Sequence, residues 1–454
     1  MATVASSVAE LCARAKRASR ALARADSEIK NAALEAIATA LEERVEEILV
    51  ANERDMQLGR EDELGDALLD RLRLDASRVA GIAGAVRQIA ALPDPVGEVI
   101  DGKRLPNGLD VRKVRVPLGV VAVVYEARPN VTIDAAALCL KSGNATVLRG
   151  SSSAEHSNAM LAQIASEAAV AAGLPDGCVT LVAGGGREEL AELATQSDSV
   201  DLIIPRGGEG LKTALQAVAT VPVIYAASGN CHIYVDASAD AEQAEAIVLN
   251  AKLQRPGVCN AVETLLVHEA IAPGFVPLIV RSLTDAGVVV RADERVIELA
   301  RDEREQGTRR LDEREQGSPA PSGSSLASQA SLSDSALVQE ASEGDWASEY
   351  LALTLAVGVV DSTDAAIEHI GRYGSGHSEA IVTRATESAR AFQLGVDAAC
   401  VYVNASTRFT DGGEFGMGAE IGNSTQKLHA RGPIGLRELC TFKYLVEGDG
   451  HVRS

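Results

Sequence analysis

The chain has 454 residues, of which 46% are hydrophobic and 3% aromatic, and its formal net charge of −21 gives a pI near 4.8. This length exceeds what one ordinary hydrophobic core supports, so two or more packed units are expected. The acidic balance argues against a nucleic-acid-binding surface, which needs a basic stripe. The sequence has no apolar run of membrane-spanning length and no secretory pattern, which predicts a cytosolic protein without membrane contact.

The seven cysteines contain no CxxC pair and no CxxC–HxxxH array, so no structural metal site is expected. They are Cys12, Cys139, Cys178, Cys231, Cys259, Cys400 and Cys440. An odd number of cysteines without a signal peptide fits reduced thiols in a reducing compartment. Cysteine usually packs as a small hydrophobic residue, so six can be inert while one is reactive.

Residues 1–92 predict helices, because apolar residues recur at spacings of three and four with few breakers. Residues 101–116 predict a polar antiparallel hairpin around the turn Asn107-Gly108. Such a protruding hairpin serves either as an oligomerisation device or as a plain surface feature.

From residue 117 onward, apolar strands alternate with helical segments. We expect strands at 120–127, 145–150, 178–184 and 200–208, with helices at 132–144, 159–174 and 186–197. Strands that are apolar on both faces indicate a parallel sheet covered by helices on each side. This α/β architecture is typical of nucleotide-binding domains.

A second α/β series begins near Cys231. It comprises a strand at 232–236, a helix at 239–254, a strand at 261–268 and a helix at 273–287. Residues 291–345 then predict a solvated acidic, Ser-rich insertion, which contains the repeat DEREQG at 302–307 and 312–317.

Cys259 lies in the stretch RPGVCNAVET, at the end of a loop, just before a predicted strand and near Arg255. A thiol in this position can be a nucleophile if its thiolate form is favoured. It can equally pack as a small apolar side chain, and the residues by themselves leave both readings open.

Five stretches occur in order along nearly the whole chain, outside 291–345. They are PLGVVAVVYEARPNV, LRGSSSAEHSN, RPGVCNAVETLLVH, YGSGHSEAIVT and FGMGAEIGNSTQKLHARGPIGLRELCTFKY. With them the chain resembles the γ-glutamyl phosphate reductases, a family of the aldehyde dehydrogenase superfamily. The resemblance implies an aldehyde-dehydrogenase-like α/β fold with a parallel-sheet cofactor domain, an α/β catalytic domain and a protruding oligomerisation hairpin.

The resemblance also implies domain boundaries and a homo-oligomer. The NADP-binding domain would comprise 1–100 and 117–236, and the catalytic domain 237–400. Residues 101–116 and 401–454 would form the oligomerisation arm and a C-terminal return segment.

The activity that the resemblance implies is reduction of L-glutamyl 5-phosphate by NADPH. The products would be L-glutamate 5-semialdehyde and phosphate, in the second step of proline biosynthesis from glutamate. Cys259 would be the nucleophile that forms a thioester, and glutamate 5-kinase would be a partner because the acyl phosphate is labile. Asn130 lies where the superfamily keeps its oxyanion-hole asparagine, although a turn residue after Pro129 is an equal reading.

One departure from the superfamily supports reduction over aldehyde oxidation. Oxidising members carry a glutamate in an ELGG-like segment, which activates water for thioester hydrolysis. The matching stretch here, YAASGNCHIYVD, has no acid before Asp236. The alternatives are a hydrolytic or CoA-acylating member of the superfamily and an inactive relative that acts as a binding protein.

For the cofactor, the resemblance implies that Arg149 replaces a lysine that holds the adenine ribose. Ser151 and Ser152 follow, where NAD-preferring relatives often have a glutamate. An arginine without a neighbouring carboxylate favours a 2′-phosphate, and hence NADP.

Further cofactor contacts are implied for the turn Arg206-Gly207-Gly208, on the pyrophosphate side. Glu349 matches a glutamate that binds the nicotinamide ribose, although an acid at a helix start is an equal reading. For the substrate's carboxylate and ammonium groups, the candidates are Asn404, Arg408 and His377. His377 could equally be structural, and Arg408 could pair with acids at a subunit interface.

Overall fold

The computed structural model describes residues 7–184, 186–225, 229–301 and 337–453. They form two compact units. The first comprises Met1–Ala226 and Gly412–Ser454, and the second comprises Ala227–Asp411. Among the described residues, no helix has both the length and the apolar character needed to cross a membrane.

The first unit begins with five helices, as the spacing of apolar residues predicts. They are α1 (Val8–Leu22), α2 (Ser27–Glu43), α3 (Val45–Glu61), α4 (Asp66–Leu72) and α5 (Ala76–Ala91). Ser7 and Glu10 form a capping box at the start of α1, and Asp26 caps α2 through the N–H of Ile29. These caps satisfy backbone donors that the first turn of a helix leaves unpaired.

A four-stranded parallel sheet forms the centre of the first unit, in the order β5-β4-β3-β6. Its strands are β3 (Val120–Tyr125), β4 (Ala145–Arg149), β5 (Val179–Leu181) and β6 (Leu202–Arg206). The connecting helices are α6 (Asn130–Lys141), α7 (Glu155–Ala171), α8 (Arg187–Ala194) and α9 (Glu209–Val218). The predicted alternation is confirmed. The strand order reverses at β3, between β4 and β6, and ligands bind at the carboxyl ends of strands at such a point.

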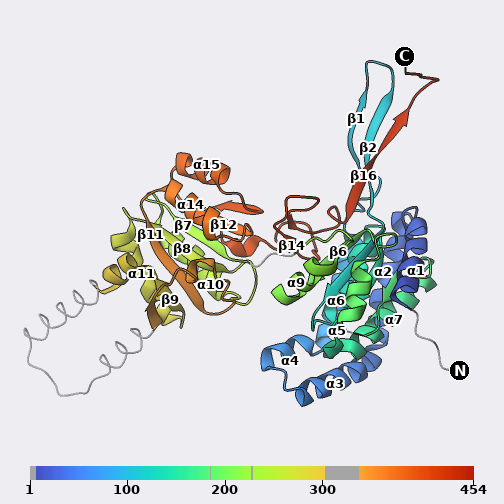
Figure 1. The fold of residues 1–454 in the computed structure, drawn as a ribbon, viewed down its shortest axis with the longest axis horizontal. Helices are drawn as coiled ribbons and strands as arrows, with labels where there is room; N and C mark the ends of the chain where they lie inside the picture. The colour runs from blue at the N-terminus through green and yellow to red at the C-terminus, as the bar shows by residue number, and fades with distance from the viewer. Residues whose placement is uncertain (1–6, 185, 226–228, 302–336, 454) are drawn as a thin grey trace, which may run out of the picture. The chain divides into compact units, whose positions relative to one another are not determined.

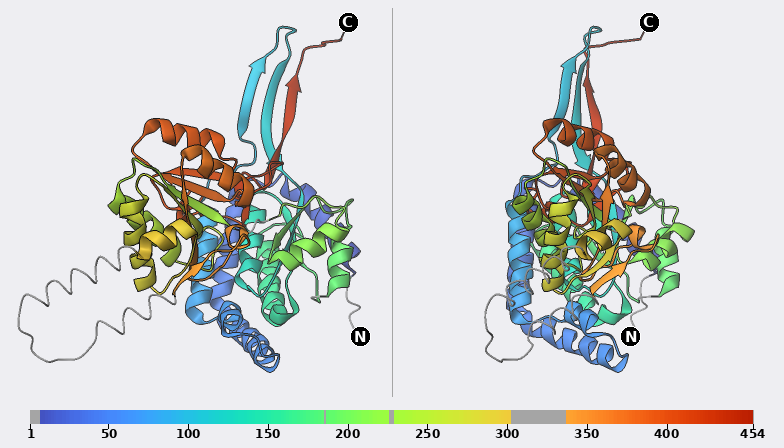
Figure 2. Two further views of the ribbon diagram at one scale, coloured as in Figure 1. Left: turned by 60° about the vertical axis from the view of Figure 1, so that its left-hand side comes forward. Right: turned by 90° about the vertical axis from the view of Figure 1, so that its left-hand side faces the viewer.

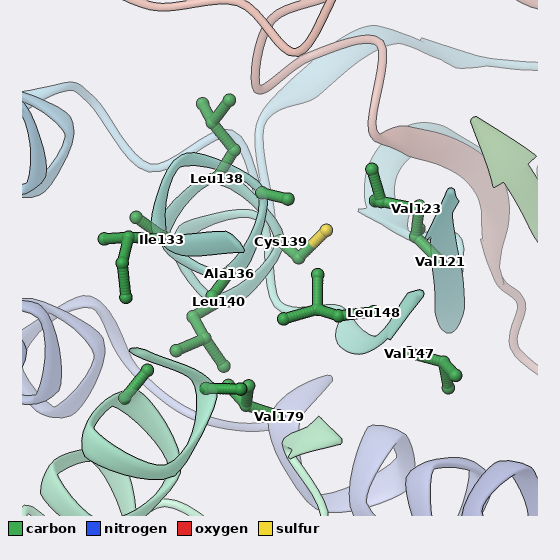
Figure 3. Packing of buried hydrophobic residues seen from close by; sticks show 14 of the residues in the cluster. Val121, Val123, Ile133, Ala136, Leu138, Cys139, Leu140, Val147, Leu148 and Val179 are labelled. Carbon is green, nitrogen blue, oxygen red and sulfur yellow. The ribbon is translucent and has the colours of Figure 1, made fainter. Parts of the chain in front are cut away.

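Cys139 illustrates how this unit uses small residues in its core. It is fully buried on α6, on the side of the helix that faces Val121, Val123 and Leu148 of the sheet (Figure 3). Removal from water raises the pKa of its thiol to about 12. Cys139 is therefore a packing residue, as expected for most of the cysteines.

The predicted hairpin is also confirmed, and it gains a third strand. Strands β1 (Val99–Arg104) and β2 (Asp110–Pro117) pair antiparallel, and β16 (Cys440–Glu447) pairs antiparallel with the other edge of β2. The three strands extend together away from the helices of the first unit (Figures 1 and 2). A two-residue strand pair, β14 (Asn423–Ser424) with β15 (Gly432–Pro433), precedes β16.

The second unit contains a seven-stranded parallel sheet in the order β10-β9-β11-β8-β7-β12-β13. Its strands are β7 (Cys231–Val235), β8 (Val262–His268), β9 (Val289–Ala292), β10 (Val338–Glu340), β11 (Thr354–Val360), β12 (Ser378–Val382) and β13 (Cys400–Val403). Its helices include α10 (Ala241–Leu253), α11 (Ala272–Asp285), α14 (Thr363–Tyr373) and α15 (Thr386–Gly395).

The unit boundaries differ from the expected ones at 236 and 400. Strand β7 belongs to the second unit because it pairs with β8 and β12, and β13 belongs there because it pairs with β12. Local periodicity identifies these strands but not the sheet that each joins, since that depends on pairing between distant segments.

The expected insertion at 291–345 is too wide at both ends. Strand β9 crosses the N-terminal bound at 291, and strand β10 lies inside the C-terminal bound at 345. The two strands pair in parallel, with Val290 opposite Val338. The DEREQG repeats and the Ser-rich run fall at 302–336, outside the described residues.

Candidate active site

Cys259 lies in the loop between α10 and β8 and differs from the other cysteines in exposure. It is partly exposed, whereas the other six are buried. Both ends of its loop are tied together by Lys252, whose ammonium donates to the carbonyl of Val262 at 2.9 Å and to the Glu263 carboxylate at 2.5 Å. The structure therefore presents one accessible thiol on an anchored loop.

The segment Gly229–Cys231 holds the main chain of Cys259. A side chain at Gly229 would overlap the Cys259 carbonyl, so only glycine fits there. The thiol of Cys231 donates to the carbonyl oxygen of Cys259 at 3.2 Å. Gly229 is itself fixed, since its N–H donates to the carboxylate of Glu349 at 2.7 Å.

Glu349 is thus close to the Cys259 loop, because Gly229 contacts both the Glu349 carboxylate and the Cys259 main chain. Its carboxylate accepts the Gly229 hydrogen bond and raises the pKa of Glu263 through charge repulsion, after the larger effect of burial. The pKa of Glu263 is about 7.

A second loop, around the 3-10 turn Thr407–Phe409, is hydrogen-bonded to the Cys259 loop. The Thr407 hydroxyl donates to the Asn260 carbonyl at 2.7 Å, and the Asn260 amide donates to the Thr410 carbonyl at 2.8 Å. The Arg408 guanidinium donates to the Gln254 side chain at 2.8 Å. The two loops therefore form one hydrogen-bonded layer.

One cation of this layer, Arg408, interacts electrostatically with the Cys259 thiol, and Arg255 interacts with Arg408. Burial lowers the pKa of Arg408, repulsion from Arg255 lowers it further, and its electrostatic partners include Asp411 and Cys259. Arginine remains charged in proteins, and positive charge beside a thiol favours the thiolate. Arg408 thus supplies a positive charge that interacts with the Cys259 thiol.

Asn404 and His377 have other partners. The Asn404 side chain donates to the carbonyl of Thr383 and accepts from its N–H, both at 2.9 Å, so its amide links two loops. His377 is fully buried, its Nδ1 lies 2.8 Å from the Ser378 hydroxyl, and burial lowers its pKa to about 4. Asn404 is exposed and His377 is buried, and a substrate-binding role for either residue stays a prediction.

Asn130 begins α6 in the first unit. Its amide nitrogen donates to the Asp134 carboxylate at 2.9 Å. Burial raises the pKa of Asp134 to about 6, which the Asn130 hydrogen bond and the charge of Arg206 partly offset. Asn130 and Arg206 are thus joined through Asp134 at the carboxyl ends of β3 and β6.

Arg206 ends β6 and leads through Gly207 and Gly208 into α9. A side chain at Gly207 would come within 2.7 Å of the Glu126 carboxylate, and the N–H of Gly208 donates to that carboxylate at 3.2 Å. An acidic group therefore interacts with the N-terminus of α9, which is the position that a pyrophosphate would take.

A cleft lies at the carboxyl ends of β4 and β5. Its lining residues are Gly150, Ser151, Ser152, Glu155, Asn158, Ala159, Leu181, Val182, Ala183 and Gly184. The two expected serines line it, and so does the carboxylate-bearing Glu155. Arg149 is buried beside the cleft and donates to the carbonyl of Gly186 at 2.7 Å, while burial lowers its pKa.

Among the described residues, no group of three or more His, Cys, Asp and Glu side chains is arranged to hold a metal ion.

Comparisons with known proteins agree with this geometry. The family model described as "Aldehyde dehydrogenase family" matches residues 2–297. The γ-glutamyl phosphate reductase of Moorella thermoacetica is 51% identical over 441 residues, which is 97% of each chain. That of Kineococcus radiotolerans is 51% identical over 451 residues, covering 99% of this chain and 97% of its own.

The chain belongs to the γ-glutamyl phosphate reductase family, within the aldehyde dehydrogenase family. The resemblance and the fold class inferred from the sequence are thereby confirmed. The crystal structure of the family member from Thermotoga maritima has a TM-score of 0.90 and 43% identity, covering 99% of this chain and 100% of its own. An acetylating aldehyde dehydrogenase from Geobacillus thermoglucosidasius, at 19% identity and a TM-score of 0.64 over 98% of this chain and 97% of its own, shares the fold.

Four residues near these sites were missed from the sequence, although three lie in or beside a stretch that carried the family resemblance and the fourth, Cys231, lies in YAASGNCHIYVD. They are Glu126, Asp134, Glu155 and Cys231. Their proximity to the candidate residues depends on hydrogen bonds and cleft walls between segments, which a motif does not display.

Proposed function

We propose that the protein reduces L-glutamyl 5-phosphate to L-glutamate 5-semialdehyde and phosphate, in the second step of proline biosynthesis from glutamate. This is the activity of an NADP-dependent glutamate-5-semialdehyde dehydrogenase (phosphorylating). The observation that carries the proposal is the Cys259 loop. It presents a single partly exposed thiol that interacts electrostatically with Arg408, in a chain 51% identical to a γ-glutamyl phosphate reductase.

Cys259 is the acyl acceptor in this proposal. Its thiolate attacks the acyl carbon of the acyl phosphate, a mixed anhydride. The bond between that carbon and the phosphate oxygen breaks, inorganic phosphate leaves, and a thioester remains. Arg408 and Arg255 favour the thiolate and attract the anionic substrate. The absence of an acid from the described part of the stretch before Asp236 protects this thioester from hydrolysis.

Asn130 is proposed to donate its amide N–H to the oxyanion that forms at the acyl carbon, with the main-chain N–H of Cys259 as second donor. Asp134 holds the amide nitrogen at 2.9 Å. The nitrogen carries a second hydrogen for the oxyanion. Arg408 is proposed to bind an anionic group of the substrate. Asn404 and His377 are proposed to contribute to the same substrate site, in addition to their hydrogen bonds within the protein.

A reduced nicotinamide cofactor, when bound, supplies the hydride for this reduction. The residues that fit it lie at the carboxyl ends of the parallel strands in the first unit: Ser151 and Ser152 in the cleft, and the turn Arg206-Gly207-Gly208 before α9. Glu349 is proposed to serve the ribose beside the nicotinamide.

The proposal that the cofactor is NADP rests on the residues expected to bind the 2′-phosphate of its adenine ribose. Ser151 and Ser152 offer hydroxyl donors, and Arg149 is adjacent, which favours a phosphate. Glu155 lines the same cleft and opposes an anion. The hydroxyls and the arginine favour the 2′-phosphate and the carboxylate opposes it, and we propose that NADP is preferred over NAD.

We also propose a cytosolic homo-oligomer. The three-stranded sheet β1-β2-β16 exposes large apolar side chains, including Val99 at 54%, Tyr444 at 60% and Val446 at 55%. Exposed apolar strands of this kind are suited to pairing with another copy. Glutamate 5-kinase remains the proposed metabolic partner, since direct transfer would protect a labile acyl phosphate.

The decisive assay is oxidation of glutamate 5-semialdehyde in the reverse direction, with and without inorganic phosphate. NADPH should form only when phosphate is present, and Cys259→Ala should lose at least about 1000-fold in rate. Cys12→Ala, at a buried packing thiol, is the matched control and should retain the rate. Reduction of NADP without phosphate would instead indicate a hydrolytic aldehyde dehydrogenase, and a dependence on CoA would indicate an acylating one.

A further inference from the structure

A second thiol lies directly against the main chain of the candidate nucleophile. Cys231, the first residue of β7, is fully buried, and its sulfur lies 3.2 Å from the carbonyl oxygen of Cys259. The charges of the two cysteines also interact. The reductive chemistry proposed above uses Cys259 and leaves Cys231 without a chemical role.

The neighbouring contacts fix this juxtaposition. The main chains of Gly229 and Cys259 are packed so closely that no side chain fits between them. The main-chain N–H of Gly229 also donates a hydrogen bond to the carboxylate of Glu349 at 2.7 Å. Cys231 therefore cannot move away from Cys259 without breaking these contacts. Cys259 lies in the loop between α10 and β8, so forming a bond to the second sulfur needs a change of its side-chain rotamer and no break in a helix or strand.

The two thiols differ in their surroundings. Cys259 is partly exposed and interacts electrostatically with Arg408, so a soluble oxidant can reach its sulfur. Cys231 lies inside the unit, with its sulfur 3.8 Å from Nδ1 of His377. Burial and the nearby Glu379 carboxylate raise its pKa well above the usual range. Cys231 thus stays protonated and does not compete for the acyl phosphate.

We propose that Cys231 is a resolving thiol that captures oxidised Cys259 in a reversible disulfide; this role rests on Cys259 being the reactive thiol of the proposed function. A hydroperoxide transfers one oxygen atom to the Cys259 thiolate, which becomes a sulfenic acid, and the peroxide is reduced to an alcohol or water. The Cys231 sulfur then attacks the sulfenic sulfur. The S–S bond forms, the S–O bond breaks, and the hydroxyl leaves as water with the proton of the Cys231 thiol.

The disulfide would stop catalysis and protect the nucleophile. A sulfenic acid without a nearby thiol is oxidised further to a sulfinic acid, which dithiols do not reduce. A disulfide is reopened by thiol–disulfide exchange. The pair would therefore let the enzyme survive a pulse of peroxide and regain activity when reducing conditions return.

The test treats the full-length protein with a few equivalents of hydrogen peroxide, alkylates the remaining thiols with iodoacetamide and maps the peptides by mass spectrometry. The wild type should yield a peptide pair joined through Cys231 and Cys259, and dithiothreitol should restore nearly all activity. Cys231→Ser should yield a Cys259 sulfinic acid and regain less than about a tenth of its activity. Cys400→Ser, at another buried thiol of the same unit, should behave as the wild type.

Absence of the Cys231–Cys259 peptide pair from oxidised wild type would overturn the proposal, as would full recovery of the Cys231→Ser variant. The peptide map of the wild type needs no variant, so a folding defect in Cys231→Ser does not affect it. It also needs no turnover. An active Cys259→Ala protein would contradict the proposed nucleophile, whereas a missing disulfide together with an inactive Cys259→Ala would contradict only the resolving thiol.

Discussion

The side-chain amide nitrogen of Asn130 donates to the carboxylate of Asp134 across 2.9 Å, within the first turns of α6. This bond orients the amide, since it requires the nitrogen and not the oxygen to face Asp134. Asp134 is in turn a nearly buried acid whose charge interacts with Arg206. One carboxylate thus links the proposed oxyanion donor to the proposed cofactor turn.

The first prediction concerns Asn130 as an oxyanion donor. Asn130→Ala should lower kcat by about 100- to 1000-fold and leave the KM for the semialdehyde nearly unchanged, because the donor acts on charge that develops during the reaction. Steady-state kinetics in the phosphate-dependent direction would measure both constants. Asp134→Asn keeps an acceptor for the amide and should retain more of kcat than Asp134→Ala. An Asn130→Ala enzyme with normal kcat would exclude this role.

The second prediction concerns the pH dependence of stability at Asp134. The folded pKa of about 6 is above the unfolded value, so the folded state binds the proton more tightly. The contribution of the Asp134 proton to the free energy of unfolding is complete below about pH 4. It is lost as the pH rises through about 6, and it changes no further above that. Asp134→Asn should therefore gain roughly 2–3 kcal/mol relative to wild type between pH 4 and pH 7.

Chemical denaturation of both proteins at pH 4.5, 5.5 and 7 would measure this difference, with these pH values spanning about the range set by the two pKa values. Asp285→Asn, at an acid for which no interaction with α6 is expected, provides the control. A constant difference between wild type and Asp134→Asn across the range would contradict the prediction.

The third prediction compares two glycines near the nucleophile. Gly229→Ala should displace the Cys259 loop, because the added methyl group would overlap the Cys259 carbonyl. Gly257→Ala lies in the loop itself but would meet only the Leu351 carbonyl, at an ordinary contact distance of 3.7 Å. We expect Gly229→Ala to lower kcat by at least about 100-fold and to change the rate of Cys259 alkylation, since misplacement by about 1 Å has such effects. Equal effects of the two substitutions would count against the close packing.

The fourth prediction concerns cofactor choice at the cleft that Ser151, Ser152 and Glu155 line. Glu155→Gln removes a negative charge near the expected 2′-phosphate and should lower the KM for NADP by about three- to tenfold, with a smaller effect for NAD. Ser152→Glu should have the opposite effect. Glu188→Gln, at an exposed acid of α8 outside the cleft lining, is the control. If Glu155→Gln changes both KM values equally, the 2′-phosphate does not bind beside this residue.

The correct expectations came from signals that lie close together along the chain. Alternating apolar strands and helices predicted the parallel sheet of the first unit, and Asn107-Gly108 predicted the turn between β1 and β2. Cys259 stays a prediction as nucleophile: it was selected because RPGVCNAVET resembles a family motif, and the structure shows that it is the cysteine with partial exposure. The weaker expectations, His377 and Asn404, came from residue type alone, and their partners could not be foreseen.

The sequence by itself determined the order of strands and helices, the family and the identity of the candidate nucleophile, because periodicity and motifs are local properties. Only the tertiary structure decided that β16 joins β2, that Cys231 donates to the Cys259 carbonyl, and that Asp134 holds Asn130. It also decided that Glu155 shares a cleft wall with the serines. The strand pairing and the Cys231–Cys259 contact arise where distant segments meet. The Asn130–Asp134 bond and the position of Glu155 follow local helical geometry, but they need the exact helix start and the cleft wall, which packing decides.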